Sequence, residues 1–193
     1  MVGIALTYTT LGIDALQVSV ECDRTGSMQF NVNIVGMPSN SVKESKDRVF
    51  AALRNSNISH QTSRYTINLA PADIKKDSSA LDLPIALSVI MNNGQIPEPQ
   101  LTKIAVVGEL SLDGNVRPVD GVLPIAIAAK RDGVDILIVP QENAEEAAII
   151  EDITVIPVTS LAETVNYLCG KAQILPAKVD RDKIFQVLND FPL

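Results

Sequence analysis

Residues 82–91 of this chain read Asp-Leu-Pro-Ile-Ala-Leu-Ser-Val-Ile-Met. The stretch has the length of a helix, and its apolar side chains fall at nearly every position instead of along one stripe. Pro84 suits the first helical turn, where backbone amides have no partner within the helix, and Asp82 is in a position to cap that turn. The stretch therefore predicts a helix that is buried on more than one side.

The segments before this helix combine strand-like alternation with one amphipathic helix. Apolar and polar residues alternate with the period of two that is typical of strands, and a helical stretch places apolar side chains on one side and charged ones on the other. The first three strands follow one another directly, which favours an antiparallel start. The predicted ranges are strands at 3–9, 13–22, 29–35 and 64–70, and a helix at 40–55.

The segments after it alternate strands with helices as far as Gly170, an order that is typical of α/β proteins. Together the two halves predict an α/β (α+β) fold with a mixed sheet and packed helices. The pattern weakens beyond Gly170, so we expect one domain at 1–170 and an extension at 171–193. The predicted ranges are strands at 103–112, 134–139 and 153–158, helices at 121–131, 141–150 and 161–168, a linker at 171–181 and a short helix at 183–189.

The composition excludes several classes of protein. The 193 residues are 46% hydrophobic and carry a net charge of -7, which is unlike a disordered chain. No apolar run approaches the roughly 18 residues of a membrane span, and an acidic chain is not a broad electrostatic binder of nucleic acid by itself. Cys22 and Cys169 lie far apart, which favours free thiols, and the N-terminus does not resemble a signal peptide. A cytoplasmic location is expected.

Most familiar catalytic and metal sites lack the residues they need. His60 is the only histidine and lies in a polar loop, so it is expected on the surface rather than in a catalytic triad. One histidine and two distant cysteines cannot form an ordinary zinc site. Gly170-Lys171 is followed by alanine and lacks the earlier glycine of a P-loop. The seven aromatic residues show no clustered platform for stacking bases.

One loop could carry chemistry. Ser78 and Ser79 precede the buried helix and share a loop with Lys75 and Lys76. A desolvated lysine could activate one of these serines as a Ser-Lys dyad, or the loop could hold an anion at the helix N-terminus. The simplest interpretation is that these are polar loop and capping residues.

Seven ordered segments stand out within residues 1–170. They are FNVNIVGMP at 30–38, SVKESKDRV at 41–49, AALRNS at 51–56, NLAPADIKK at 68–76, DLPIA at 82–86, GELSLDG at 108–114 and RPVDGVLP at 117–124. Together these segments resemble the N-terminal domain of the magnesium-chelatase-like AAA+ ATPases of the YifB/ComM family. The resemblance implies a fold similar to the proteolytic domain of Lon, in the ribosomal S5 domain-2 superfamily.

The resemblance also implies a larger parent protein. In whole family members this domain precedes an ATP-hydrolysing AAA+ module, so ATP and magnesium ion are expected in a part that this chain does not contain. ComM-type proteins are hexameric DNA helicases that drive branch migration, which implies a homo-hexamer and DNA as partners of the parent. No porphyrin and no membrane are expected. We therefore expect this chain to be the front portion of a longer one, ending in a linker near residues 190–193.

The resemblance to Lon allows the Ser-Lys hypothesis to be examined position by position. Aligning the helix at 82–86 places Ala80 at the nucleophile position, although a slip of one residue would place Ser79 there. Aligning the stretch at 117–121 places Leu123 at the lysine position, and Lys130 lies seven residues further on, roughly 10 Å along a helix. The sequence therefore predicts a Lon-type fold without peptidase chemistry and no catalytic residue in this segment.

Three functions remain as hypotheses. The leading one is a non-catalytic accessory domain of a DNA motor; the alternatives are a Ser-Lys peptidase of Lon type and a protein-interaction module that recruits partners to the motor. Basic side chains could contact DNA or a neighbouring subunit, or could simply form a solvated helix face. These are Lys43, Lys46, Arg48, Arg54, Arg64, Lys75 and Lys76.

Overall fold

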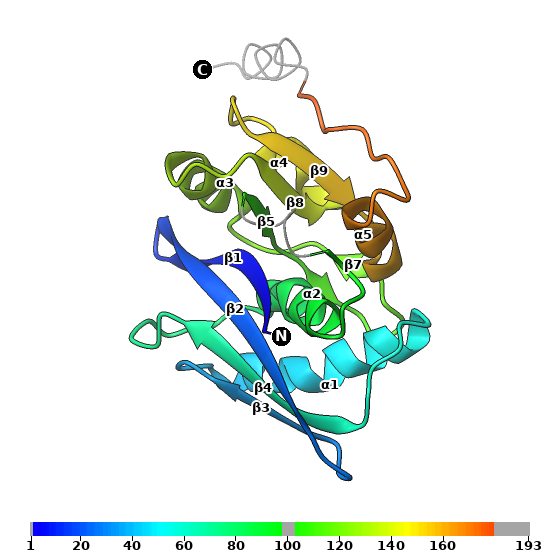
Figure 1. Cartoon of the computed structure of the whole chain (residues 1–193). Helices are drawn as coiled ribbons and strands as arrows, with labels where there is room; N and C mark the ends of the chain where they lie inside the picture. Colours follow the sequence, from blue (N-terminus) through cyan, green and yellow to red (C-terminus); the bar gives the residue numbers. More distant parts are fainter. Residues whose placement is uncertain (1, 98–102, 180–193) are drawn as a thin grey trace, which may run out of the picture.

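The computed structural model describes residues 2–97 and 103–179. Its centre is a seven-stranded mixed sheet in the order β3-β4-β2-β1-β5-β8-β9, with helices packed on both faces (Figure 1). This confirms the predicted α/β class with a mixed sheet. The strands of the sheet are β1 (Gly3–Leu11), β2 (Asp14–Gly26), β3 (Asn31–Val35), β4 (Ser63–Ala70), β5 (Ile104–Val106), β8 (Ile136–Pro140) and β9 (Thr154–Val158).

The sheet changes from antiparallel to parallel at β1. On one side β1 pairs antiparallel with β2, which pairs antiparallel with β4. On the other side β1, β5, β8 and β9 pair in parallel. The edge strand β3 is parallel to β4. The predicted antiparallel start is therefore confirmed, and the parallel half is the part of the chain in which strands alternate with helices.

The helices form a layer on each side of the sheet. Apolar side chains of α1 (Asn40–Asn55), α2 (Asp82–Asn92) and α5 (Leu161–Leu168) belong to one core cluster, and those of α3 (Val122–Arg131) and α4 (Ala144–Ala147) to a second. Successive residues of β8 alternate between the clusters, because Leu137 and Val139 join the second and Ile138 the first. Each face of the parallel half of the sheet thus has its own core.

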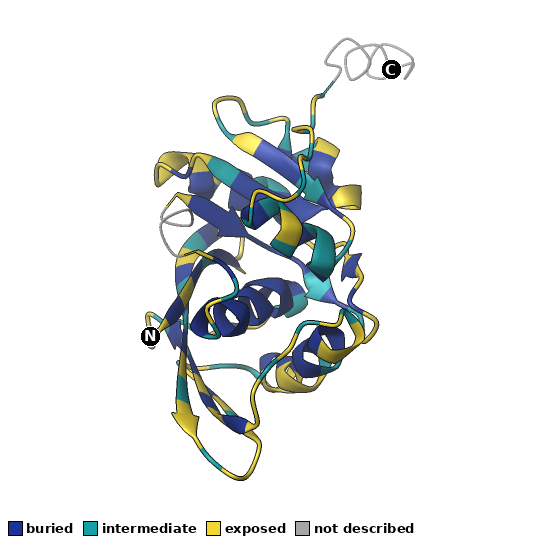
Figure 2. Cartoon of the chain, turned by 45° about the vertical axis from the view of Figure 1, so that its right-hand side comes forward, coloured by how far each residue is buried: buried dark blue, intermediate teal, exposed yellow. Residues whose placement is uncertain are grey.

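Helix α2 is the buried helix that the sequence predicts. All of its residues are buried, and it appears dark blue throughout its length in the middle of the molecule (Figure 2). It packs against β1 and β2 of the sheet and, on another side, against α1 (Figure 1). Strand β1 approaches it so closely that a Cβ atom at Gly3 would lie 2.0 Å from the carbonyl oxygen of Ser88. Only glycine fits at this contact.

Two predicted elements differ from the structure. The strand expected at 103–112 is divided into β5 and β6 (Glu109–Leu110), and β6 pairs with β7 (Val116–Arg117) in a separate two-stranded sheet. The chain leaves the main sheet because the Gly108 amide donates to the Ala80 carbonyl, 2.9 Å away. The helix expected at 141–150 is a 3-10 turn at Gln141–Asn143 followed by the single turn of α4.

The segment predicted as a linker has no regular secondary structure over residues 171–179 but is attached to the sheet. The Ala177 amide donates to the Val155 carbonyl in β9, 2.8 Å away, and Ile174 packs against the first core cluster. The short helix expected at 183–189 lies outside the described residues. Among the helices of the described ranges, none has both the length and the apolar character that crossing a bilayer requires.

Candidate functional site

The loop before α2 places the residues of the Ser-Lys hypothesis. A 3-10 turn at Ser79–Leu81 leads into the helix, and the Ser78 hydroxyl accepts a hydrogen bond from the Ala80 amide at 3.1 Å. Ser78 therefore caps this turn, as the simplest interpretation of the loop expects. Ala80 is only 2% exposed and belongs to the second core cluster. The position that the alignment gives to a nucleophile thus holds a methyl group packed in the core.

The lysines that could activate a serine all have other partners. Lys75 pairs with Asp77 at 3.2 Å, and Lys130 pairs with Asp152 at 3.2 Å. Within the described ranges, no hydrogen bond joins a lysine to the hydroxyl of Ser78 or Ser79.

The second position of the alignment lies at the start of another helix. Leu123 is half-buried in the first turn of α3, where its amide donates to Glu146 Oε1 at 3.1 Å. A leucine side chain has no group that can accept or hold a proton. The assignment of the degenerate dyad to Ala80 and Leu123 remains a prediction.

Asp82 does not cap α2 as expected but forms a buried ion pair with Arg48 of α1. Its two carboxylate oxygens accept from Arg48 Nε at 2.6 Å and Arg48 Nη2 at 3.0 Å, and the Leu110 amide donates to it at 3.2 Å. The Asp82 side chain is 0% exposed and that of Arg48 is 24% exposed. This bidentate pair joins α1, α2 and β6 and is part of the fold rather than of a surface.

Burial and pairing act on this ion pair in opposite directions. Burial raises the pKa of the Asp82 carboxyl, against the hydrogen bonds from Arg48 and Ser45 that lower it. The hydrogen bond to Asp82 raises the pKa of the Arg48 guanidinium, which stays charged. A carboxylate in this position is costly to bury and depends on its partner.

Lys76 is likewise removed from the predicted contact surface. It is 0% exposed, and its Nζ donates to the carbonyl oxygen of Pro71. Burial lowers the pKa of its ammonium group. The expectation that Arg48 and Lys76 are surface contacts is therefore corrected, because one is paired with Asp82 and the other lies inside its own loop.

The other five predicted basic residues are exposed but do not share one surface. Lys43, Lys46 and Arg54 lie on the outer side of α1, and Lys75 lies in the loop before α2. Arg64 is on β4, whose alternate residues Tyr65 and Ile67 face the core, so Arg64 points from the opposite face of the sheet.

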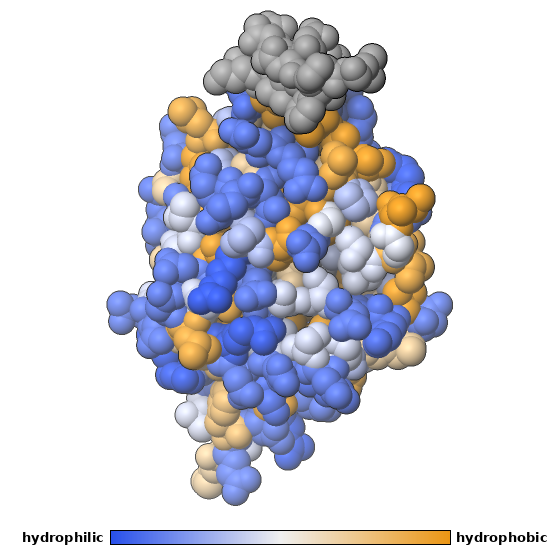
Figure 3. Space-filling view, turned by 180° about the vertical axis from the view of Figure 1, so that it is seen from behind, coloured by the Kyte–Doolittle hydropathy of each residue, from blue (hydrophilic) through white to orange (hydrophobic). Residues whose placement is uncertain are grey.

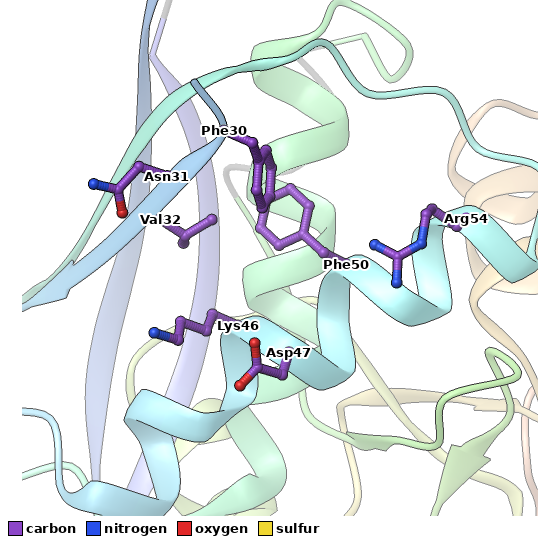
Figure 4. Close-up of a pocket in the computed structure, with 7 residues that line it drawn as sticks. All are labelled: Phe30, Asn31, Val32, Lys46, Asp47, Phe50 and Arg54. Carbon is purple, nitrogen blue, oxygen red and sulfur yellow. The ribbon is translucent and has the colours of Figure 1, made fainter. Parts of the chain in front are cut away.

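A groove lies between the edge strand β3 and α1. Its larger part is a pocket of about 340 Å³, where Lys46 and Arg54 lie along the helix on either side of the facing rings of Phe30 and Phe50 (Figure 4). A smaller pocket of about 130 Å³ continues along β3 and shares Val32 and Lys46 with the first. The groove combines an apolar floor with walls that carry two cations, Lys46 and Arg54, and the carboxylate of Asp47.

The floor of the groove belongs to an aromatic cluster. The ring centroids of Phe30 and Phe50 are 4.9 Å apart, and those of Phe50 and Tyr65 are 5.3 Å apart. His60 lies 5.2 Å from Phe50, so it packs half-buried against these rings instead of lying free in a polar loop. Burial, helped by the charge of Arg54, lowers the pKa of His60.

The sequence predicts no clustered platform for stacking bases; the aromatic side chains do meet in the folded chain, but Phe50 is only 3% and Tyr65 0% exposed, so the cluster is packed inward. Phe30, Phe50 and Tyr65 are 20 and 15 residues apart in sequence, and no local periodicity connects them. The available signal was that each lies in a different predicted element. Within the described ranges, no group of three or more histidine, cysteine or acidic side chains could hold a metal ion.

Several proteins are similar to this chain over most of its length. An uncharacterized protein of Mycobacterium tuberculosis is 39% identical over 168 residues, which are 87% of this chain and 33% of that protein. Competence protein ComM of Haemophilus influenzae is 33% identical over 89% of this chain and 34% of its own length. Uncharacterized protein YifB of Escherichia coli is 34% identical over 87% of this chain and 33% of its own length. The chain thus spans about a third of these relatives.

A weaker similarity reaches Lon. Lon protease of Aster yellows witches'-broom phytoplasma is 32% identical over 108 residues, 51% of this chain and 13% of that protease. Residues 20–143 match the family described as subunit ChlI of Mg-chelatase, and this range includes β3, α1, α2 and the groove. The chain therefore belongs to the magnesium-chelatase-like ChlI family, with relatives that include ComM and YifB.

Proposed function

We propose that this chain is a non-catalytic N-terminal accessory domain of a magnesium-chelatase-like AAA+ ATPase. The observation that supports this proposal is the start of α2, where Ala80, at the position that the alignment gives to a nucleophile, is buried and the nearby lysines have other partners. The similarity over about a third of each relative supports a larger parent. The domain then serves assembly, guidance of the substrate or regulation, and the chemistry belongs to the rest of the parent.

The parent in this proposal is a cytoplasmic, ATP-driven hexamer that moves DNA, as a helicase or branch-migration motor. ATP and magnesium ion bind its AAA+ module, and porphyrin is not a substrate. The name of the Haemophilus relative, a competence protein, supports a DNA role. This domain contributes exposed cations that can meet phosphates at the rim of the assembled ring, although its own net charge is -7.

The test uses the full-length parent and replaces two exposed cations outside the groove. Arg64→Glu with Lys75→Glu should weaken DNA binding at low salt and reduce the salt dependence, with the slope of log K against log salt falling by about two. Lys103→Glu is the matched control, because Lys103 is an exposed lysine outside the predicted set. If the double substitution leaves DNA binding unchanged, the hypothesis that this domain guides DNA is wrong. Lys76 is kept, since replacing a buried lysine would disturb the fold.

The peptidase hypothesis has its own test. The proposal expects no labelling of the chain by a serine-reactive fluorophosphonate probe, because neither Ser78 nor Ser79 has a hydrogen-bonded lysine among the described residues. Labelling that disappears in Ser79→Ala but persists in Ser78→Ala would establish a nucleophile and overturn the non-catalytic assignment.

A further inference from the structure

The two edge strands of the main sheet, β3 and β9, differ in whether another segment of the chain bonds to their free side. At one edge, β9 receives a hydrogen bond from the chain's own segment, from the Ala177 amide to the Val155 carbonyl at 2.8 Å. At the other edge, β3 pairs with β4 on one side, and no other strand in the described part of the chain pairs with its free side. An open edge presents backbone donors and acceptors that another extended segment can use.

The groove beside this open edge has the right shape for such a segment. It runs between β3 and α1, so a strand added to β3 would direct every second side chain toward the outer side of α1. Along α1, Lys46 and Arg54 are eight residues apart, which corresponds to about 12 Å. Two residues four apart in an extended chain are about 13 Å from each other, so their side chains match these two cations.

The chemistry of the groove differs between its ends and its middle. Lys43, Lys46 and Arg54 have no ion-pair partner within 4.0 Å among the residues that the structure describes. Between the cations, Phe30 is 46% exposed although its ring packs on Phe50. The ends therefore favour carboxylates and the middle favours an apolar side chain.

Further apolar side chains lie exposed close to β3 in the sequence. Met28 is 100% exposed, and Val35 and Met37 are exposed as well. On the face seen in Figure 3, hydrophobic side chains form small separate groups among hydrophilic ones. The exposed side chains of Phe30, Val35 and Met37 thus add apolar surface beside the open strand.

We propose that the groove between β3 and α1 binds an extended acidic segment of a partner protein. The segment adds a strand to the free side of β3 and has the pattern acidic-x-apolar-x-acidic, with its carboxylates at Lys46 and Arg54 and its apolar side chain against Phe30. This goes beyond the proposed DNA role, because the ligand is a protein and the residues differ from Arg64 and Lys75.

A protein strand fits this groove better than single-stranded nucleic acid. Phe50 is only 3% exposed, so Phe30 alone offers a ring face on which a base could stack. The free backbone groups of β3 also match a peptide, whose amides and carbonyls can continue the sheet.

The experiment titrates the isotope-labelled chain with the peptide Ac-Thr-Glu-Thr-Val-Thr-Glu-Thr-NH2 at low salt and follows backbone amide NMR signals. The expected result is binding with signal changes centred on Asn31–Val35 and α1. The isomer Ac-Thr-Thr-Glu-Val-Glu-Thr-Thr-NH2 has the same charge and composition but places its acids on the other face of the strand. It should bind at least about tenfold more weakly.

Two variants on the protein side complete the test. Lys46→Glu with Arg54→Glu should weaken binding of the first peptide about tenfold or more, whereas Arg64→Glu, which reverses a charge on the opposite face of the neighbouring strand, should change it less than about twofold. Circular dichroism and urea midpoints establish that the variants fold; if the double variant does not, the isomeric peptide on the unaltered chain decides. Equal binding of both peptides, or a thymidine oligonucleotide that displaces the peptide through Lys46 and Arg54, would overturn the proposal.

Discussion

Arg48 and Lys46 are cations two residues apart on the same helix, yet Arg48 is paired with a buried carboxylate and Lys46 is exposed. Arg48 points toward α2 and holds the buried carboxylate of Asp82 in two hydrogen bonds. Lys46 points into the groove beside β3 and has no ion-pair partner among the described residues. Side chains two apart on a helix lie on different faces, so neighbours in the sequence can belong to the core and to a binding surface.

The difference shows that a basic residue is informative about binding only when its partners are known. A buried charge needs a counter-charge or hydrogen bonds, because water is absent to solvate it. An exposed cation without a partner is left free to recruit one from outside. Helix α1 therefore has an inner face that stabilises the fold and an outer face that is available to a ligand, and four measurements can separate them.

The largest expected effect is on the inner face. Asp82→Ala leaves Arg48 and the Leu110 amide without their acceptor, and we expect the free energy of unfolding to fall by about 3 kcal/mol. Urea denaturation measures it. Asp77→Ala is the control, because the Asp77 side chain is 58% exposed and an exposed ion pair should contribute far less to stability. Similar losses in both variants would mean that the Arg48–Asp82 pair has no special role.

A second, comparable effect concerns the buried Lys76. Lys76→Glu places a carboxylate beside the Pro71 carbonyl at a position that is 0% exposed to solvent, and should lower the free energy of unfolding by about 3 kcal/mol. Lys76→Met keeps most of the volume without the charge and should cost less than about 1.5 kcal/mol. Both are measured by urea denaturation. If Lys76→Glu is as stable as the unaltered chain, Lys76 is a surface residue after all.

A smaller effect is expected from His60, at the border between core and groove. Its pKa is lowered by burial and by Arg54, so the folded chain binds this proton less tightly than the unfolded chain. The stability gained from neutral His60 is complete above the ordinary histidine pKa of about 6.5 and is lost as pH falls through that value toward the lowered folded pKa. His60→Gln should therefore flatten the decline of the urea midpoint between about pH 7 and pH 5. An unchanged pH profile would place His60 in solvent.

The smallest effect on stability is expected on the outer face. Lys46→Glu breaks no ion pair among the described residues and should change the free energy of unfolding by less than about 0.5 kcal/mol. The same variant should weaken binding of the acidic peptide, so the two readouts separate a ligand contact from a structural one. A loss of stability comparable to that of Asp82→Ala would show that the two faces of α1 are not distinct.

Much of the fold follows from local patterns. The helices at Asn40–Asn55 and Leu161–Leu168 occupy the predicted ranges, because their apolar side chains recur with helical period and polar side chains cap them. The strand predicted at 103–112 failed for the opposite reason. Gly108 continues an apolar run, but its amide bonds to the Ala80 carbonyl in the turn before α2 instead of to a strand, and no local pattern reports that.

The candidate site was less predictable than the fold. The sequence predicts Lys46 and Arg54 as possible contacts, and it predicts a degenerate dyad at Ala80 and Leu123. It could not separate Lys46 and Arg54 from Arg48 and Lys76, which carry the same charge. Nor could it show that Phe30 meets Phe50, since the contact depends on how β3 lies against α1.

The sequence by itself determined the α/β class, the buried helix α2 and the membership in a family, because periodicity, composition and ordered motifs are properties of neighbouring residues. The tertiary structure alone decided which charges are buried, which ring contacts form and which edge of the sheet stays open. Those outcomes depend on contacts between residues far apart in the sequence. Arg48 and Asp82 are 34 positions apart, and their contact excludes water from the Asp82 carboxylate, whereas the nearby Lys46 stays exposed to solvent. Solvation, and not residue type, distinguishes the two faces of α1.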